Sequence, residues 1–214
     1  MIPCERPGFA DRIPGLRACF LGRAPGIDVD ADRETVLARL ASVHRQAADE
    51  LGFAGMPFAT ATQVHGNSVA IVDAPGESPG CDGLVTATRG VCLAIYVADC
   101  AAVFLADRDG RACGLLHSGK KGTELGIARE GVRAMADRLG CAPSGLLAWI
   151  SPCIRPPHYE TDFAATIVRQ LEDAGVAEIS GPPACTASHP DRYYSYRREM
   201  VRTGRMLALM ALVP

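Results

Sequence analysis

The sequence predicts a single α/β domain in which mixed β-sheets are flanked by helices. Two observations carry this prediction: short runs rich in valine, isoleucine and leucine fill much of residues 68–150, and segments with apolar residues at helical spacing lie around and between them. The length of the chain is consistent with a single domain, because 214 residues with 48% hydrophobic content can bury one sizeable core. We expect this domain to span residues 29–214.

The first segment, residues 1–28, is rich in proline, glycine and arginine. Such a composition is typical of an irregular arm. A helix is expected to follow, with Asp30 as its N-cap and Gly52 as its end. Its apolar positions recur every three or four residues, at Val36, Leu40, Val43, Ala47 and Leu51.

Five runs are predicted as strands, at residues 69–72, 91–97, 103–105, 113–116 and 146–150. Several are apolar at consecutive rather than alternating positions, which indicates strands that are covered on both faces. Two further helices complete the pattern. One carries an apolar stripe from Ile127 to Leu139 before Gly140, and the other runs from Asp162 to Gly175.

The composition limits the classes of partner. A formal net charge of −2 gives no long-range field for holding nucleic acid or an anionic membrane, so we expect a small-molecule substrate and neither of those partners. We find no secretory signal and no apolar run of about 20 residues, and the nine cysteines form no CxxC pair. These features predict a cytoplasmic protein with free thiols, either a monomer or a small homo-oligomer.

Three soft or borderline metal ligands lie at the ends of short apolar runs: His65, Cys100 and His117. Two imidazoles and a thiolate are a ligand set for Zn²⁺, and three protein ligands leave a fourth position open for water or substrate. Such a site could also bind copper. Taken singly, a histidine at a strand end is more often structural, and Cys100 is more often a buried thiol. Gly66 beside His65 and the acidic Asp99 beside Cys100 favour the functional interpretation.

The segment after His117 is predicted to bind an anion. Ser118, Gly119, Lys120, Lys121 and Thr123 form a loop between a strand and a helix, an arrangement that aims backbone N–H groups and lysine charge at phosphate. A solvated turn with Thr123 as N-cap is the alternative. The loop has lysine where a P-loop needs serine or threonine for Mg²⁺, so we do not predict ATP hydrolysis.

Three other positions could contribute polar groups. Gln63 supplies an amide two residues before His65, on the same face if the chain is extended there. Glu160 ends a proline-rich loop at residues 151–160, which could instead be a structural turn. Arg197 belongs to a block of alternating tyrosine and arginine that could stack a planar base and hold an anion, or could simply form an arginine cluster on the surface.

Taken in order, six blocks resemble the laccase-domain family. They are Gln-Val-His-Gly (63–66), Cys-Asp-Gly-Leu-Val-Thr (81–86), Ala-Asp-Cys (98–100), Leu-His-Ser-Gly-x-x-Gly-Thr (116–123), Pro-Cys-Ile-x-Pro-x-x-Tyr-Glu (152–160) and Ser-Tyr-Arg-Arg (195–198). This family is also called the polyphenol oxidoreductase family and is now regarded as purine nucleoside phosphorylase-like. Six blocks in family order are far more specific than any one of them.

The resemblance implies a layered single-domain α/β protein with zinc held by His65, Cys100 and His117. It also implies phosphorolysis of adenosine and related purine nucleosides, adenosine deamination, or copper-dependent phenol oxidation. For phosphorolysis we expect Lys120, Lys121 and the amides of residues 119–123 to hold phosphate, with Arg197 balancing its charge. For deamination we expect Glu160 or Asp82 to move protons.

The chain departs from the family where Lys120 and Lys121 replace a Trp-Arg pair and where Pro157 and His158 replace a cysteine pair. These changes leave a metal-binding protein without catalysis as an alternative. A hydrolase with Cys100 as nucleophile and His117 as base is another. Five histidines in the whole chain cannot supply the ligands of a true multicopper laccase.

Overall fold

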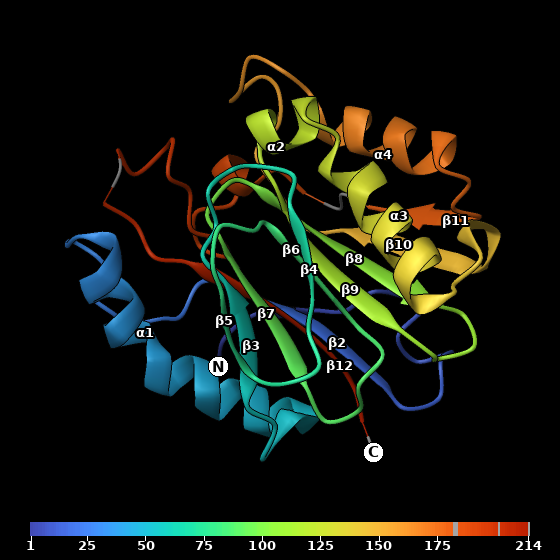
Figure 1. The fold of residues 1–214 in the computed structure, drawn as a ribbon. Coiled ribbons are helices and arrows are strands. Elements are labelled where there is room, and N and C mark those ends of the chain that lie inside the picture. The colour runs from blue at the N-terminus through green and yellow to red at the C-terminus, as the bar shows by residue number, and fades with distance from the viewer. Residues whose placement is uncertain (182–183, 201, 214) are drawn as a thin grey trace.

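The computed structural model describes residues 1–181, 184–200 and 202–213, which form two six-stranded sheets (Figure 1). The first sheet contains, in spatial order, β1 (Cys4–Glu5), β2 (Leu16–Leu21), β12 (Met206–Leu212), β7 (Cys92–Val97), β3 (Phe58–Ala61) and β5 (Gly76–Ser78). The strands from β1 to β7 pair in antiparallel fashion, whereas β3 runs parallel to both β7 and β5. The sheet is therefore mixed, as the sequence predicts.

The second sheet is mixed as well. Its spatial order is β11 (Glu178–Ser180), β10 (Leu146–Ile150), β8 (Ala101–Asp107), β9 (Cys113–Ser118), β6 (Gly83–Thr86) and β4 (Val69–Ile71). The two edge strands, β11 and β4, pair in parallel with their neighbours, and the four central strands are antiparallel. Every residue of β8, β9 and β10 is buried, which confirms that these strands are covered on both faces.

The two sheets face one another across the main core. Phe20 of the first sheet packs edge-on against Trp149 of the second, with ring centroids 6.3 Å apart, and Phe104 packs against the same indole at 5.0 Å. Helices α3 (Ile127–Leu139) and α4 (Phe163–Asp173) cover the other face of the second sheet (Figure 1). Helix α1 (Arg33–Ala48) lies beside the first sheet. The molecule is layered in the order helix, sheet, sheet, helices.

The predicted helices are present, with corrections at both ends of α1. Asp32 rather than Asp30 is the N-cap, and its carboxylate accepts a hydrogen bond from the Thr35 N–H at 3.0 Å. Asp30 lies before the helix and forms an ion pair with Arg202 instead. The helix ends at Ala48 and not at Gly52, which has φ of 91° and lies inside the π-helical turn η1 (Asp49–Phe53) that follows. No helix of the described residues is long and apolar enough to cross a membrane.

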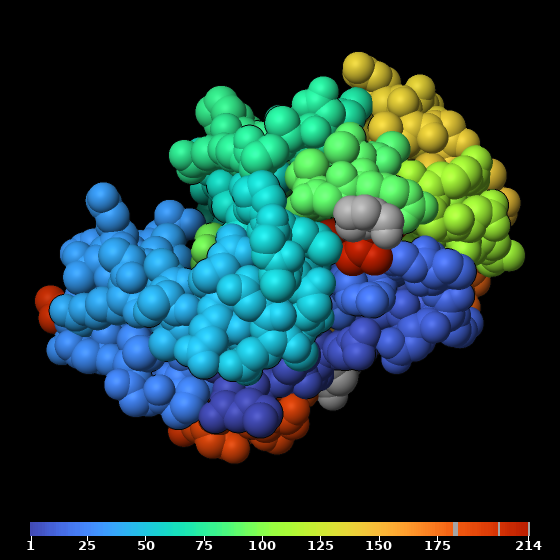
Figure 2. Space-filling view, turned by 90° about the horizontal axis from the view of Figure 1, so that it is seen from below, coloured from blue at the N-terminus to red at the C-terminus, as the bar shows by residue number. Residues whose placement is uncertain are grey.

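The prediction that residues 1–28 are irregular is wrong for β1 and β2. Strand β2 is buried and lies between β1 and β12, and Figure 2 shows the blue N-terminal residues packed against the rest of the molecule. Strand β2 was not predicted because the exposed Arg17 interrupts its apolar run and Pro14-Gly15 precedes it. Strand β12, which the sequence analysis did not assign, pairs with both β2 and β7 near the centre of the sheet.

Candidate metal centre and its cavity

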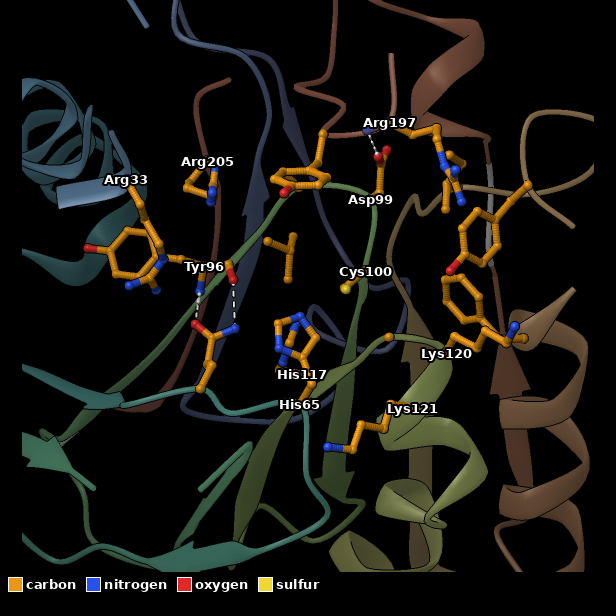
Figure 3. A pocket seen from close by; sticks show the side chains of 18 of the residues that line it. Arg33, His65, Tyr96, Asp99, Cys100, His117, Lys120, Lys121, Arg197 and Arg205 are labelled. Carbon is orange, nitrogen blue, oxygen red and sulfur yellow. Dashed lines mark hydrogen bonds between the residues drawn. The ribbon is translucent and has the colours of Figure 1, made fainter. Parts of the chain in front are cut away.

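The three predicted metal ligands converge at one end of the two sheets. His65 lies between β3 and β4, Cys100 directly precedes β8, and His117 is in β9. Their ligand atoms all lie within 4.8 Å of one another. The rings of His65 and His117 meet at 76° with centroids 4.8 Å apart, and the Cys100 thiol lies beside them (Figure 3).

Left-handed backbone conformations place two of these side chains. His65 has φ of 60°, and Asp99, the neighbour of Cys100, has φ of 78°. Residues other than glycine adopt such angles at an energetic cost, so the surrounding contacts must hold them there. Asp82 supplies those contacts for His65: its buried carboxylate accepts the backbone N–H groups of Val64, His65 and Gly66 at 3.2, 2.9 and 2.7 Å.

The same carboxylate orients His117. Asp82 Oδ1 lies 2.7 Å from His117 Nδ1, which therefore carries a proton and leaves Nε2 as the atom available to a metal. Burial would raise the pKa of Asp82, but its hydrogen bonds to His117 and to the loop amides outweigh burial and lower it. The carboxylate is thus ionised in the folded protein and lies behind His117, away from the cavity.

Cys100 and His117 shift each other's pKa in opposite directions. Burial would raise the pKa of Cys100, but the charge and hydrogen bond of His117, together with His65, lower it to about 6. Burial would likewise lower the pKa of His117, but the Cys100 charge and Asp82 raise it to about 9. Thiolate is the form of cysteine that binds metal. The donor set, the fixed histidine tautomer and the ionised sulfur together fit a zinc-type ion.

The absence of a side chain at Gly119 allows Cys100 Sγ to lie close to the backbone. A Cβ atom at this position would lie 2.6 Å from Cys100 Sγ, which is far inside van der Waals contact. Because φ of Gly119 is −92°, the backbone itself would permit another residue there. The glycine is therefore required by the close approach to Cys100 and not by the turn.

The metal ligands open into a cavity of about 930 Å³. This volume is at the upper end of the range for small-molecule sites. Its lining combines apolar and aromatic side chains with cations from segments distant in sequence. They include Arg33, Tyr96, Lys120, Lys121, Ile154, Tyr159, Phe163, Tyr196, Arg197 and Arg205.

Gln63 lines the cavity, but its amide is already hydrogen-bonded. Nε2 donates to the Tyr96 carbonyl at 2.8 Å, and Oε1 accepts the Tyr96 N–H at 3.3 Å (Figure 3). The amide thus pairs with the backbone of β7 as another strand would. It ties the loop that carries His65 to the first sheet.

The predicted anion loop divides into two parts. Gly119, Lys120 and Lys121 line the cavity, whereas Ser118 and Thr123 are buried and do not. Their hydroxyl groups lie 2.8 Å apart, and the Thr123 hydroxyl donates to the Gly119 carbonyl at 2.8 Å. Thr123 lies within α2 (Lys120–Glu124), whose N-cap is Gly119, so the alternative with Thr123 as N-cap is wrong.

Glu160 lies at the exposed rim between two cations. It accepts hydrogen bonds from Lys120 and from Arg197, each at 3.2 Å. The Arg197 guanidinium also lies 5.0 Å from the centre of the Tyr159 ring. His158, which with Pro157 replaces the cysteine pair of the family, is exposed and does not line the cavity. Glu160 therefore neutralises part of the positive charge on this side.

Sequence reasoning missed several lining residues, among them Arg33, Tyr96 and Arg205. Arg33 is the first residue of α1 and Arg205 directly precedes β12, so only the fold brings them together. Neither lies in one of the distinctive sequence blocks. Asp99, noted for its place beside Cys100, accepts hydrogen bonds from the Thr186 hydroxyl at 2.6 Å and the Arg197 N–H at 2.7 Å, which fixes the segment around Arg197 to the site.

Comparison with known proteins identifies the family to which the sequence is similar. The model of a family described as multi-copper polyphenol oxidoreductase laccase matches residues 20–164 and, in a second match, residues 158–213. A protein of Deinococcus radiodurans named purine nucleoside phosphorylase is 34% identical over 95% of this chain and 88% of its own length. A Streptomyces coelicolor protein with the same type of name is also 34% identical, over 93% of this chain and 92% of its own.

Solved structures share the fold. The crystal structure of YlmD from Geobacillus stearothermophilus superposes with a TM-score of 0.81 at 27% identity, covering 94% of this chain and 93% of that one. A Neisseria meningitidis protein, NMB0706, has a TM-score of 0.78 at 22% identity and covers 94% of this chain and 96% of its own. The two-sheet α/β architecture is thus an established fold.

Proposed function

The chain belongs to the multi-copper polyphenol oxidoreductase laccase family, and from this membership we propose that it is a zinc-dependent purine nucleoside phosphorylase. One observation carries the proposal: the His65, Cys100 and His117 cluster opens into a cavity large enough for a nucleoside, with aromatic and cationic side chains in its wall. The names of the two relatives at 34% identity support the choice of reaction.

The proposed reaction transfers a ribosyl group. The bond between ribose C1′ and the purine nitrogen breaks, its electron pair leaves with the base, and a phosphate oxygen bonds to C1′. The base takes up a proton, and the products are free purine and ribose 1-phosphate. The protein must therefore hold a planar base and an anion on either side of the ribose and exclude water from C1′.

The cavity wall offers groups for each task. Tyr159, Phe163 and Ile154 form an apolar side on which a purine can stack. Cationic side chains elsewhere in the wall can hold phosphate. For deamination, sequence reasoning proposed Asp82 and Glu160 as proton carriers. Asp82 reaches the cavity only through His117, so we assign it a positioning role. Glu160, at the rim, remains the candidate proton carrier for that alternative reaction.

His65, Cys100 and His117 would hold the metal ion. When bound there, zinc supplies a Lewis acid that polarises a substrate oxygen or lowers the pKa of a water molecule. The same ligands suit copper, which generally binds such sites more tightly than zinc does. Zinc content in the purified protein therefore has to be measured and not assumed.

The direct test is product analysis with adenosine. Metal-quantified protein is incubated with and without phosphate, and adenine and inosine are separated by chromatography, with His117→Ala as the control. Adenine that forms only with phosphate and only from the unsubstituted protein supports the proposal. Inosine formed without phosphate would assign deamination instead.

The remaining alternatives give other results in the same assay. Full activity in His117→Ala would contradict both metal-dependent reactions. A protein that turns over no nucleoside although it binds one zinc per chain would be a metal-binding protein without this catalysis. Hydrolytic activity that survives metal removal and is lost in Cys100→Ser would indicate a cysteine hydrolase.

A further inference from the structure

Two arginines from distant parts of the chain line the same side of the cavity. Arg33 is the first residue of α1, and Arg205 lies just before β12. Figure 3 shows both guanidinium groups on one side of the metal ligands, near Tyr96, with Lys120 and Arg197 on the opposite side. The cavity therefore has two separate cationic regions.

Among the described residues, no carboxylate pairs directly with Arg33 or Arg205, although the charge of Asp99 acts on Arg205. Within residues 1–181, 184–200 and 202–213, no ion pair is formed by either arginine. Arg205 Nη1 donates to the carbonyls of Thr203 and Gly204 at 2.8 and 2.9 Å, which fixes the guanidinium in place without neutralising it. The nearby Arg202, by contrast, pairs with Asp30 at 2.8 Å.

The two charges repel one another. Burial lowers the pKa of Arg205, and the charge of Arg33 lowers it further. Smaller contributions from Tyr196, Cys100 and Asp99 oppose this shift. Arg33 also lies at the N-terminus of the 16-residue helix α1, where the helix dipole disfavours a cation. Both unfavourable interactions would be relieved by an anion between the guanidinium groups.

The opposite region is less suited to an anion. Lys120 and Arg197 share the carboxylate of Glu160, so part of their charge is already neutralised. Helix α2 has only five residues, and its Thr123 N–H is bonded to the Gly119 carbonyl. Lys121 is an exposed cation beside this region.

We propose that Arg33 and Arg205 form the subsite for the phosphate co-substrate, each guanidinium donating to phosphate oxygens from one side. This inference rests on the proposed function. It places phosphate on the Tyr96 side of the metal ligands, the purine against Tyr159 and Phe163, and the ribose between them. It replaces the expectation that Lys120, Lys121 and the amides of residues 119–123 hold phosphate.

The test measures phosphate binding apart from turnover. Inorganic phosphate is titrated into the zinc-loaded protein without nucleoside and followed by ³¹P NMR, and the KM values for phosphate and adenosine are determined separately. The variants are Arg33→Gln, Arg205→Gln and the conservative Arg33→Lys. Arg202→Gln is the matched control, because Arg202 is exposed and does not line the cavity, and Lys120→Gln with Lys121→Gln tests the rival location.

We expect Arg33→Gln and Arg205→Gln each to weaken phosphate binding and raise its KM about tenfold or more, as loss of a charged hydrogen bond does. The KM for adenosine should change less than about threefold, Arg33→Lys should recover part of the loss, and Arg202→Gln should behave like the unsubstituted protein. Melting temperatures check folding, and Arg33 at an exposed helix start keeps the test valid if Arg205→Gln does not fold.

Other outcomes separate the two proposals. The proposed subsite is wrong, but the proposed function is retained, if adenosine is cleaved and the arginine variants keep the KM for phosphate of the unsubstituted protein. The same conclusion follows if the lysine variants change that KM instead. If phosphate binds through Arg33 and Arg205 but no purine nucleoside is cleaved, the function is wrong and the anion site stands. An unsubstituted protein that binds no phosphate would overturn the subsite.

Discussion

Asp82 Oδ1 lies 2.7 Å from His117 Nδ1, and the same carboxylate accepts the N–H groups of the turn that carries His65. One buried acid therefore positions two of the three metal ligands, although it touches neither the cavity nor the metal position.

Asp82→Asn should weaken zinc binding about 10- to 100-fold, because it removes the charge that orients His117 and leaves the volume nearly unchanged. Competition with a chromophoric chelator measures the affinity. Asp73→Asn, at an exposed position, is the matched control. Equal zinc affinity in Asp82→Asn and the unsubstituted protein would show that Asp82 does not position the ligands.

Gly119→Ala should lower the zinc content per chain, because its Cβ would lie 2.6 Å from Cys100 Sγ and must displace the sulfur. Gly8→Ala is the control, since no atom lies within 4 Å of a Cβ at that exposed position. Metal analysis after gel filtration gives the stoichiometry. A fully loaded Gly119→Ala protein would mean that the sulfur can move without losing the metal.

Gln63→Leu should reduce zinc affinity a few-fold but leave base selectivity unchanged, because both ends of the Gln63 amide bond to the Tyr96 backbone. The ratio of kcat/KM for adenosine to kcat/KM for inosine measures selectivity. A change in that ratio of about tenfold would indicate that Gln63 contacts the base directly. Loss of a polar contact to one substrate changes selectivity by that factor or more.

His44 should make the protein less stable in mild acid. Its side chain is buried, neither ring nitrogen has a hydrogen-bond partner among the described residues, and burial lowers its pKa from 6.5 to about 4. The unfolded chain therefore binds the proton first as pH falls from 6.5 towards 4, and stability is lost across that window. At pH 5 the loss is about 2 kcal/mol.

Urea unfolding at about pH 7.5 and at pH 5 measures this effect. His44→Leu should lose about 2 kcal/mol less stability between the two pH values than the unsubstituted protein does. His158→Gln, at an exposed histidine, should behave like the unsubstituted protein. The same acid sensitivity in His44→Leu would assign the titration to other groups.

The metal ligands could be predicted from the sequence because each lies in its own distinctive block and ends a recognisable apolar run. The structure confirms that His65, Cys100 and His117 meet. Arg33 and Arg205 could not be predicted, because neither lies in a distinctive block. Only the pairing of β12 with β7, together with the position of α1, brings them to one cavity.

Strand β12 was not predicted because its sequence pattern fits either a helix or a strand. Strand β12 reads Met-Leu-Ala-Leu-Met-Ala-Leu, which has no β-branched residue and suits a helix equally well. Its extended form is dictated by β2 and β7, which lie on either side of it. The Gln63 amide was visible in sequence, but its bonding to Tyr96 depends on contacts that spacing cannot show.

The metal ligands lie where the chain passes between the sheets: His65 follows β3 of the first sheet and precedes β4 of the second, and Cys100 joins β7 of the first to β8 of the second. An ion bound there would connect both of these segments, through His65 and Cys100, to His117 of β9. Metal binding and the alignment of the two sheets are thus thermodynamically linked, and each factor of ten in free zinc above the dissociation constant adds about 1.4 kcal/mol to the stability of that alignment. Chelation should therefore increase amide hydrogen exchange along the inter-sheet core as well as emptying the site.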